Sequence, residues 1–266
     1  MKIRLDHEIY RRGLTNSREK AKALVIAGQV SVNGIKIDKP GTNINEDVEI
    51  LIENSPRYVS RGGYKLEKAL EDFNINLIGK IVLDIGASTG GYTDCALQNG
   101  AEHIYALDVG YGQLDWKLRN NPQVTNIERM NIRNFTINDL GEKVDIITID
   151  VSFISTKLVF PVASELIKDD GIIISLIKPQ FEAGRSQVGK KGVVKDDKVH
   201  LEVLLNSIEN ARNSGLNCTD ITFSPIRGPK GNIEYFLCLT KSGYPVDNIT
   251  RLAHEVVAKA HKDFGG

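Results

Sequence analysis

The segment that decides the fold of most of this chain reads Ile81-Val82-Leu83-Asp84-Ile85-Gly86-Ala87-Ser88-Thr89-Gly90-Gly91-Tyr92-Thr93. An apolar run leads directly into a glycine-rich turn, and a helical pattern follows the turn. Glycine adopts backbone angles that other residues avoid, and it lets the main chain approach a ligand closely. The segment therefore predicts a strand, turn and helix that bind a nucleotide-like cofactor.

The glycine spacing distinguishes between cofactors. A dinucleotide site has the pattern G-x-G-x-x-G, whereas this chain has three residues between Gly86 and Gly90. We interpret this spacing as a site for S-adenosylmethionine rather than NAD. A second apolar run, 103–107, ends in Asp108, whose carboxylate is placed to accept hydrogen bonds from both ribose hydroxyls of the cofactor. The cofactor-binding residues predicted from these two segments are Asp84, Gly86, Ala87, Ser88, Gly90, Gly91, Tyr92 and Asp108.

Strand and helix patterns alternate through the rest of this part of the chain. Such alternation is typical of a mostly parallel sheet covered by helices on both faces. We therefore predict a Rossmann-like α/β domain with a seven-stranded sheet. The expected strands are 81–85, 103–107, 124–127, 144–149, 171–177, 220–223 and 235–240.

Composition bounds the class of protein. The 266 residues are 41% hydrophobic and carry a formal net charge of zero, which argues against a broad basic surface but not against a local one. Cys95, Cys218 and Cys238 are isolated and odd in number, so neither a disulfide framework nor a zinc site is expected. No apolar signal segment or membrane-spanning run is evident, and we expect a cytoplasmic protein without a bound metal.

The first 53 residues have their own pattern of helices and strands. Helical patterns near 5–13 and 17–27 precede a hairpin over 30–37 with an Asn33-Gly34 turn, and 48–52 supplies a further strand. We predict a small α+β domain at 1–53, a linker at 54–60 and the α/β domain at 61–266.

Basic residues gather in two places. Those of the first two helices outnumber Asp6, Glu8 and Glu19, and a second group surrounds glycines near 184–192. Charge alone leaves two interpretations open for each group, a phosphate-binding surface or an ordinary solvated one. The candidate RNA-binding residues are Arg4, Arg11, Arg12, Arg18, Lys20 and Lys22 in the first group, and Arg185, Lys190, Lys191 and Lys195 in the second.

The N-terminal segments resemble a known RNA-binding module. Arg4-Leu-Asp, Ser17-Arg-Glu-Lys-Ala and Gly28-Gln-Val-x-Val-Asn-Gly are similar to the module first described in ribosomal protein S4. This resemblance implies binding to structured RNA.

The type of methyl acceptor is constrained by motifs that the chain lacks. The fourth strand of the large domain ends Ile149-Asp150-Val151-Ser152-Phe153, without the proline pair typical of enzymes that methylate exocyclic base nitrogens. None of the cysteines has the Pro-Cys context of carbon-5 methylation. What remains are ionisable residues at strand ends, whose ordinary interpretation is solvated charge. They are Lys65, Asp150, Lys178 and Glu234.

Together these residues resemble a family. Ser60-Arg-Gly-Gly-Tyr-Lys65-Leu, Asp84-Ile-Gly-x-x-x-Gly-Gly, Ile149-Asp150, Lys178-Pro and Gly231-Asn-Ile-Glu234 are similar to FtsJ-like ribose methyltransferases. The run Lys178-Pro-Gln-Phe-Glu-Ala-Gly-Arg-x-Gln-Val-Gly-x-x-Gly-Val-Val resembles the TlyA branch, ribosomal RNA 2′-O-methyltransferases historically labelled haemolysins. The resemblance implies a Lys65, Asp150, Lys178, Glu234 catalytic tetrad, S-adenosylmethionine as methyl donor, and ribosomal RNA or ribosomal subunits as partners.

The resemblance leaves the role of Lys178 open. Burial and the nearby Lys65 would disfavour its charged form and suit it to accept the proton of the hydroxyl. Alternatively, Lys178 stays charged and positions the ribose while water takes the proton. Asp150 and Glu234 would orient the amines and the hydroxyl, and Asp150 also borders the cofactor. Many relatives have an acid after the third strand to meet the adenine, where this chain has Asn131.

Two alternative functions remain at this stage. One is a non-catalytic RNA-binding protein of ribosome assembly, against which the intact tetrad argues. The other is a membrane-active haemolysin, as the family label suggests, against which the lack of a spanning or strongly amphipathic basic helix argues. Oligomeric state is not determined by the sequence.

Overall fold

The computed structural model describes residues 2–52, 57–243 and 246–265, which form two compact units, Met1–Arg57 and Tyr58–Gly266. Part of the predicted linker, 54–56, lies outside the described residues, as does residue 53. The Tyr58 side chain is buried in the core of the second unit. The larger unit therefore begins before residue 61, and the predicted linker extends too far.

The first unit contains two helices and two small antiparallel sheets. Ser17 caps the second helix, because its side chain accepts a hydrogen bond from the Lys20 backbone N–H. Asn33 and Gly34 both have positive φ angles, 49° and 78°, which suits the predicted tight hairpin. The pairing of β1 with β4 was not predicted. The elements are β1 (Lys2–Arg4), α1 (Leu5–Arg11), α2 (Arg18–Ile26), β2 (Val30–Val32), β3 (Ile35–Lys36), β4 (Asn43–Asn45) and β5 (Ile50–Ile52).

The larger unit is built on a seven-stranded sheet with the order β11-β12-β10-β9-β6-β7-β8. The five strands from β10 to β8 are parallel, and β12 runs antiparallel to both β10 and β11. This confirms the predicted Rossmann-like fold. The strands are β6 (Ile81–Ile85), β7 (His103–Leu107), β8 (Val124–Ile127), β9 (Val144–Ile149), β10 (Ile167–Ile177), β11 (Asn217–Phe223) and β12 (Tyr235–Thr240).

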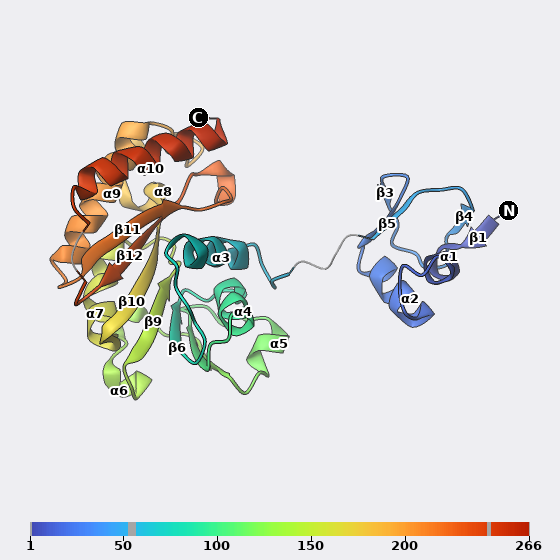
Figure 1. The fold of residues 1–266 in the computed structure, drawn as a ribbon, viewed down its shortest axis with the longest axis horizontal. Helices are drawn as coiled ribbons and strands as arrows, with labels where there is room; N and C mark the ends of the chain where they lie inside the picture. The colour runs from blue at the N-terminus through green and yellow to red at the C-terminus, as the bar shows by residue number, and fades with distance from the viewer. Residues whose placement is uncertain (1, 53–56, 244–245, 266) are drawn as a thin grey trace. The chain divides into compact units, whose positions relative to one another are not determined.

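Helices cover both faces of this sheet (Figure 1). Alternate strand residues point to opposite faces, so Leu83 and Ile147 pack with α7, α9 and α10, whereas Val82 and Ile146 pack with α3 and α4. Apolar side chains therefore bury both faces of the sheet. The helices are α3 (Gly62–Asp72), α4 (Gly91–Gln98), α5 (Trp116–Arg119), α6 (Ile137–Leu140), α7 (Phe160–Leu166), α8 (Pro179–Glu182), α9 (Asp197–Arg212) and α10 (Ile249–Phe264).

The strand order places one crevice at the centre of the sheet. The chain runs from β6 outward to β7 and β8, and then returns to the other side of β6 with β9. Ligands of open α/β sheets bind outside the carboxyl ends of the strands at such a reversal. The ends of β6 and β9, at Ile85 and Ile149, pair with each other there.

Candidate active site

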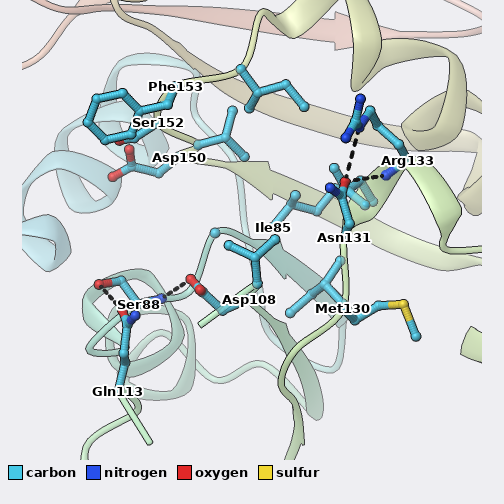
Figure 2. A pocket seen from close by; sticks show the side chains of 16 residues that line it. Ile85, Ser88, Asp108, Gln113, Met130, Asn131, Arg133, Asp150, Ser152 and Phe153 are labelled. Carbon is cyan, nitrogen blue, oxygen red and sulfur yellow. Dashed lines mark hydrogen bonds between the residues drawn. The ribbon is translucent and has the colours of Figure 1, made fainter. Parts of the chain in front are cut away.

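A cavity of about 490 Å³ opens at the carboxyl ends of β6, β7 and β9. Its volume lies within the usual range for small-molecule and cofactor sites. Figure 2 shows side chains around it that follow β7, β8 and β9, namely Asp108, Asn131 and Asp150. Three regions that are distant in the sequence therefore meet at the crevice that the fold predicts.

The glycine turn forms one wall of this cavity, and packing explains its glycines. Gly86 has a φ of 89°, and a Cβ there would lie 2.6 Å from the Asp150 carbonyl oxygen. Gly90 has a φ of 93° immediately before α4, and a Cβ there would clash with Leu118. Both positions thus require glycine because of the backbone angle and because of protein neighbours.

Asp84, predicted to bind the cofactor, lies beneath the turn and not in the wall of the cavity. It is almost fully buried and accepts hydrogen bonds from the hydroxyls of Thr93 (2.7 Å) and Thr148 (2.9 Å). Burial raises the pKa of Asp84 to about 6, against the opposing effect of the two hydroxyls. Its structural part is to tie β6 to β9 and to the start of α4.

Asp108 and Asn131, predicted to bind the cofactor, both line the cavity. The Asp108 carboxylate accepts backbone N–H bonds from Ser88 (2.8 Å) and Gly110 (2.6 Å), which fix its orientation. The Asn131 side-chain oxygen accepts from the Arg133 backbone N–H at 3.1 Å (Figure 2). An ionised carboxylate keeps further lone pairs for ligand hydroxyls, and the Asn131 amide nitrogen remains a donor.

A smaller cavity of about 290 Å³ adjoins the first, and the two share four residues of their walls. Three of the four predicted catalytic residues line it, Lys65, Asp150 and Lys178. Ala87, Gly91 and Tyr92, predicted for the cofactor, also contribute. The shared residues are Gly86, Ser88, Asp150 and Ser152.

The predicted tetrad forms two ion pairs, one buried and one partly buried. Lys65 Nζ lies 2.6 Å from Glu234 Oε2, although the two residues are 169 positions apart in the chain. Lys178 Nζ lies 2.6 Å from Asp150 Oδ1. Glu234 is fully buried behind the cavity wall, whereas the two lysines are just accessible. Each amine therefore faces the cavity with its counter-ion already in place.

Four further residues belong to this site and were not predicted. Ser152 Oγ lies 3.0 Å from Lys178 Nζ, and Gln180 donates to Glu234 Oε1 at 3.3 Å. Phe153 is 90% exposed with a φ of 63°, and its ring centre lies 4.8 Å from that of Phe181. The one sequence signal that could have indicated any of them is the aromatic residue Phe153 close behind the strand that ends at Ile149.

The candidate RNA-binding arginines of the first unit are anchored by two carboxylates that are buried. Arg4 and Arg18 pair with Asp6 at 3.1 Å and 3.2 Å. Arg11 and Arg12 pair with Glu8, each at 2.7 Å, and lower the pKa of Glu8 to about 2. Lys20 and Lys22 are exposed on α2. In the larger unit Arg185, Lys190, Lys191 and Lys195 are exposed outside both cavities.

The fold and the site together define a class of α/β enzymes. In this class the acceptor group, with the proton that it must lose, lies beside a nucleotide-like cofactor. Residues 58–241 match the model of FtsJ-like methyltransferases, and residues 3–50 match the S4 domain. The chain belongs to the FtsJ-like methyltransferase family and carries an S4 domain ahead of the catalytic unit.

Individual relatives agree with this assignment. The chain is 48% identical over 270 residues to YqxC of Bacillus subtilis, named as a candidate rRNA methyltransferase, covering 98% of this chain and 95% of that relative. It is 42% identical over 240 residues to the 16S/23S rRNA (cytidine-2′-O)-methyltransferase TlyA of Mycobacterium tuberculosis, covering 90% of each. A solved structure from Streptococcus thermophilus, named as a candidate hemolysin, is 44% identical with a TM-score of 0.77, covering 99% of this chain and 97% of that one.

Within the described ranges, no helix is long and apolar enough to cross a membrane. In the same residues, no group of three or more His, Cys, Asp or Glu side chains is arranged to hold a metal ion.

Proposed function

We propose that this chain transfers a methyl group from S-adenosylmethionine to a ribose 2′-hydroxyl of ribosomal RNA. The observation that carries the proposal is the two lysine–carboxylate ion pairs, whose lysines line a cavity that adjoins the nucleotide-sized pocket. Relatives named as cytidine-2′-O-methyltransferases support cytidine as the target nucleotide.

The larger cavity suits the methyl donor. Asp108 offers a fixed carboxylate for ribose hydroxyls, and Asn131 offers an amide donor for the adenine. Gly86 and Ser88 belong to both cavities, so a molecule in the larger one extends toward the amines of the smaller one. S-adenosylmethionine supplies, when bound, the electrophilic methyl group.

The residues of the smaller cavity have two tasks, which are to align the hydroxyl and to manage its proton. Lys178 and Lys65 are donors that can hold the 2′-oxygen, and their carboxylate partners keep both amines in place. Asp150 also borders the cofactor cavity. The tetrad therefore borders both the cavity of the methyl donor and the cavity of the ribose.

Lys178 can serve the proton transfer in two ways. As an ammonium held by Asp150, it would position the ribose and stabilise the developing alkoxide. As a neutral amine, it would instead accept the proton directly.

The rim of the larger cavity offers a platform for a nucleobase. Phe153 lines this cavity and is 90% exposed, and it directly follows Ser152, which lines both cavities. Bases of single-stranded RNA stack on aromatic rings when proteins display them outside a helix. We infer that the target base stacks on Phe153 while its ribose reaches the amines.

The N-terminal unit supplies the affinity for structured RNA. Its S4-type match and its carboxylate-anchored arginines support ribosomal RNA or a ribosomal subunit as the partner. A substrate of this kind fits the expected cytoplasmic location.

The test is transfer of labelled methyl groups from S-adenosylmethionine to purified ribosomal subunits, followed by nuclease digestion and mass spectrometry of the nucleosides. A 2′-O-methylated nucleoside formed by the wild-type chain supports the proposal, and a base-methylated one contradicts it. Cofactor binding without transfer to either subunit points to another RNA. No cofactor binding would favour a ribosome-assembly role, and leakage from lipid vesicles would revive the haemolysin interpretation.

A further inference from the structure

Asn232 lies two residues before Glu234 in the Gly231–Glu234 motif and has no part in the chemistry described above. It is 1% exposed, and both ends of its side-chain amide are used. Its oxygen accepts the backbone N–H of Val194 at 3.1 Å, and its nitrogen donates to the Gly192 carbonyl at 2.9 Å. One buried side chain thus holds two residues on the side of a loop that follows its tip, 38 to 40 residues earlier in the sequence.

That loop ends in a tight turn with two lysines at its tip. The Gly192 N–H bonds to the Gly189 carbonyl at 2.7 Å, so Lys190 and Lys191 occupy the central positions of a β-turn. Gly192 has a φ of 74°, which favours glycine. Both lysine side chains are exposed. Val194 is buried and anchors the segment that follows the turn.

His200 on α9 contacts the same loop from a second side. Its Nε2 lies 3.1 Å from the Val194 carbonyl oxygen and its Nδ1 lies 2.8 Å from the hydroxyl of Tyr235, the residue after Glu234. A carbonyl only accepts, so Nε2 carries the proton and Nδ1 accepts. The loop is therefore tied to residues on both sides of Glu234.

The segment that carries Asn232 also encloses the Glu234 carboxylate. The Gly228 N–H bonds to the Asn232 carbonyl at 2.9 Å, which closes the short loop between them. A Cβ on Gly228 would clash with the Glu234 carboxylate, so the loop lies directly against the acid that pairs with Lys65. The same seven residues thus contact the reaction centre and the lysine-bearing turn.

We propose that Asn232 is a positioning residue that docks the Lys190–Lys191 turn beside the reaction centre, where the two ammonium groups bind RNA phosphates next to the target ribose. The inference rests on the proposed function. Phosphates are its ligand because the turn presents two adjacent cations and the acceptor is a nucleotide within an RNA chain.

The experiment compares Asn232→Ala, the double variant K190A/K191A, and all three substitutions together in the full chain. Binding of ribosomal RNA is measured against salt concentration, and methyl transfer is measured at limiting and saturating RNA. Each lost phosphate contact should reduce the log–log salt slope by about 0.7–0.9, so the lysine variant loses about 1.4–1.8. Asn232→Ala should raise KM for RNA and reduce the same slope, with S-adenosylmethionine affinity unchanged.

The variant with all three substitutions tests whether Asn232 acts through the two lysines. If Asn232 acts through the two lysines, the three substitutions together should weaken RNA binding no more than K190A/K191A alone. Losses that add fully, or an unchanged salt slope in Asn232→Ala, would overturn the proposal. Asn217 is the matched control, since it donates to the Gly243 carbonyl at 2.9 Å in another loop, and Asn217→Ala should leave RNA binding unchanged.

The same measurements separate this inference from the proposed function. K190A/K191A alters only exposed side chains, so it remains informative even if Asn232→Ala does not fold. A wild-type chain that binds RNA with the expected salt dependence but forms no 2′-O-methyl product would contradict the proposed function. Normal product formation with an unchanged salt slope in K190A/K191A would contradict this inference alone.

Discussion

Both units of the chain bury carboxylates against basic residues, but they place the cations differently. In the N-terminal unit Asp6 and Glu8 are fully buried, whereas the side chains of Arg18 and Arg11 are 40% and 52% exposed. In the catalytic unit the lysines of the two pairs are buried as well, with Lys65 9% exposed. One arrangement presents positive charge to solvent, and the other withdraws it into a cavity.

The difference follows from the chemistry of the two cations. A guanidinium has five donors in a rigid plane, so it can hold a carboxylate and still bind a phosphate. An ammonium is a compact, strongly hydrated charge that is costly to bury unless paired, and its protonation responds to its surroundings. Anchored arginines thus suit recognition of an RNA surface, and buried lysines suit handling of a hydroxyl proton.

The largest expected effect is on Lys178, which contacts Asp150 and Ser152 in the reaction cavity. Lys178→Ala should lower the single-turnover rate of methyl transfer by at least the factor of roughly 10²–10⁴ that general acid–base groups supply. S-adenosylmethionine affinity, measured by equilibrium dialysis, should be retained because Lys178 does not line the larger cavity.

Lys168 provides the matched control for that variant. Its Nζ pairs with Asp145 at 2.8 Å, but near the start of β9 and outside both cavities. Lys168→Ala should therefore keep the wild-type rate. Equal single-turnover rates for Lys178→Ala and the wild type would remove Lys178 from the reaction.

A second test concerns the cost of breaking a fully buried pair. Glu234→Gln leaves the Lys65 charge in the interior without its counter-ion, and removal of one partner of such a pair typically costs about 3–5 kcal/mol. Glu8→Gln should cost less, because Arg11 and Arg12 can turn to water. Urea unfolding of both variants measures the difference, and equal losses of unfolding free energy would contradict the contrast between the units.

The third prediction addresses the arginines as RNA contacts. The double variant Arg11→Ala, Arg12→Ala should weaken binding of ribosomal RNA and reduce the log–log salt slope by about 1.4–1.8, as for two phosphate contacts. Arg251, which pairs with Glu255 on α10, serves as the control and should leave the slope unchanged when replaced by alanine. A slope that stays constant in the double variant would assign the two arginines to folding alone.

The smallest effect is expected from pH. Hydrogen bonds from Arg11, together with Arg12, lower the pKa of Glu8 from 4.5 to about 2. Because the folded-state pKa is lower than the unfolded one, the pairing stabilises the fold fully above pH 4.5 and is lost as pH falls toward 2. In the Glu8→Gln variant, the first unit should lose less stability than in the wild type as the pH falls from 5 to 2, which unfolding experiments measure. Equal losses of stability in the variant and the wild type would show that Glu8 makes no contribution.

Local patterns made most of the fold predictable. The Rossmann-like sheet followed from alternating apolar runs and glycine turns. In the first unit, Asn33-Gly34 marked the hairpin because both positions need positive φ. The three-residue pair of β1 and β4 could not be seen, since such short strands have no periodicity. The extended start of β10 at Ile167 was hidden by the polar residues that follow it.

The site was less predictable because it depends on pairings across the fold. The sequence pattern identified Lys65 and Glu234 as candidates, but Lys65 lies on α3 and not at a strand end. Its contact with Glu234 depends on the fold, because Glu234 directly precedes β12, which inserts antiparallel beside β10. The sequence showed Asp6 and Glu8 only as acids outnumbered by basic residues, since a charge count does not show which carboxylates are buried against arginines. Asn232 looked like part of a family motif until its two hydrogen bonds were seen.

The most direct test measures two quantities, the affinity for ribosomal RNA and the single-turnover rate of 2′-O-methylation at saturating RNA, in Lys178→Ala and in the Arg11, Arg12 double variant. A division between recognition and reaction predicts that Lys178→Ala keeps its affinity and loses its rate, whereas the arginine variant loses affinity and keeps its rate. If both variants lose the same quantity, or if the arginine variant is slow even at saturation, the two sets of ion pairs do not divide the work in this way.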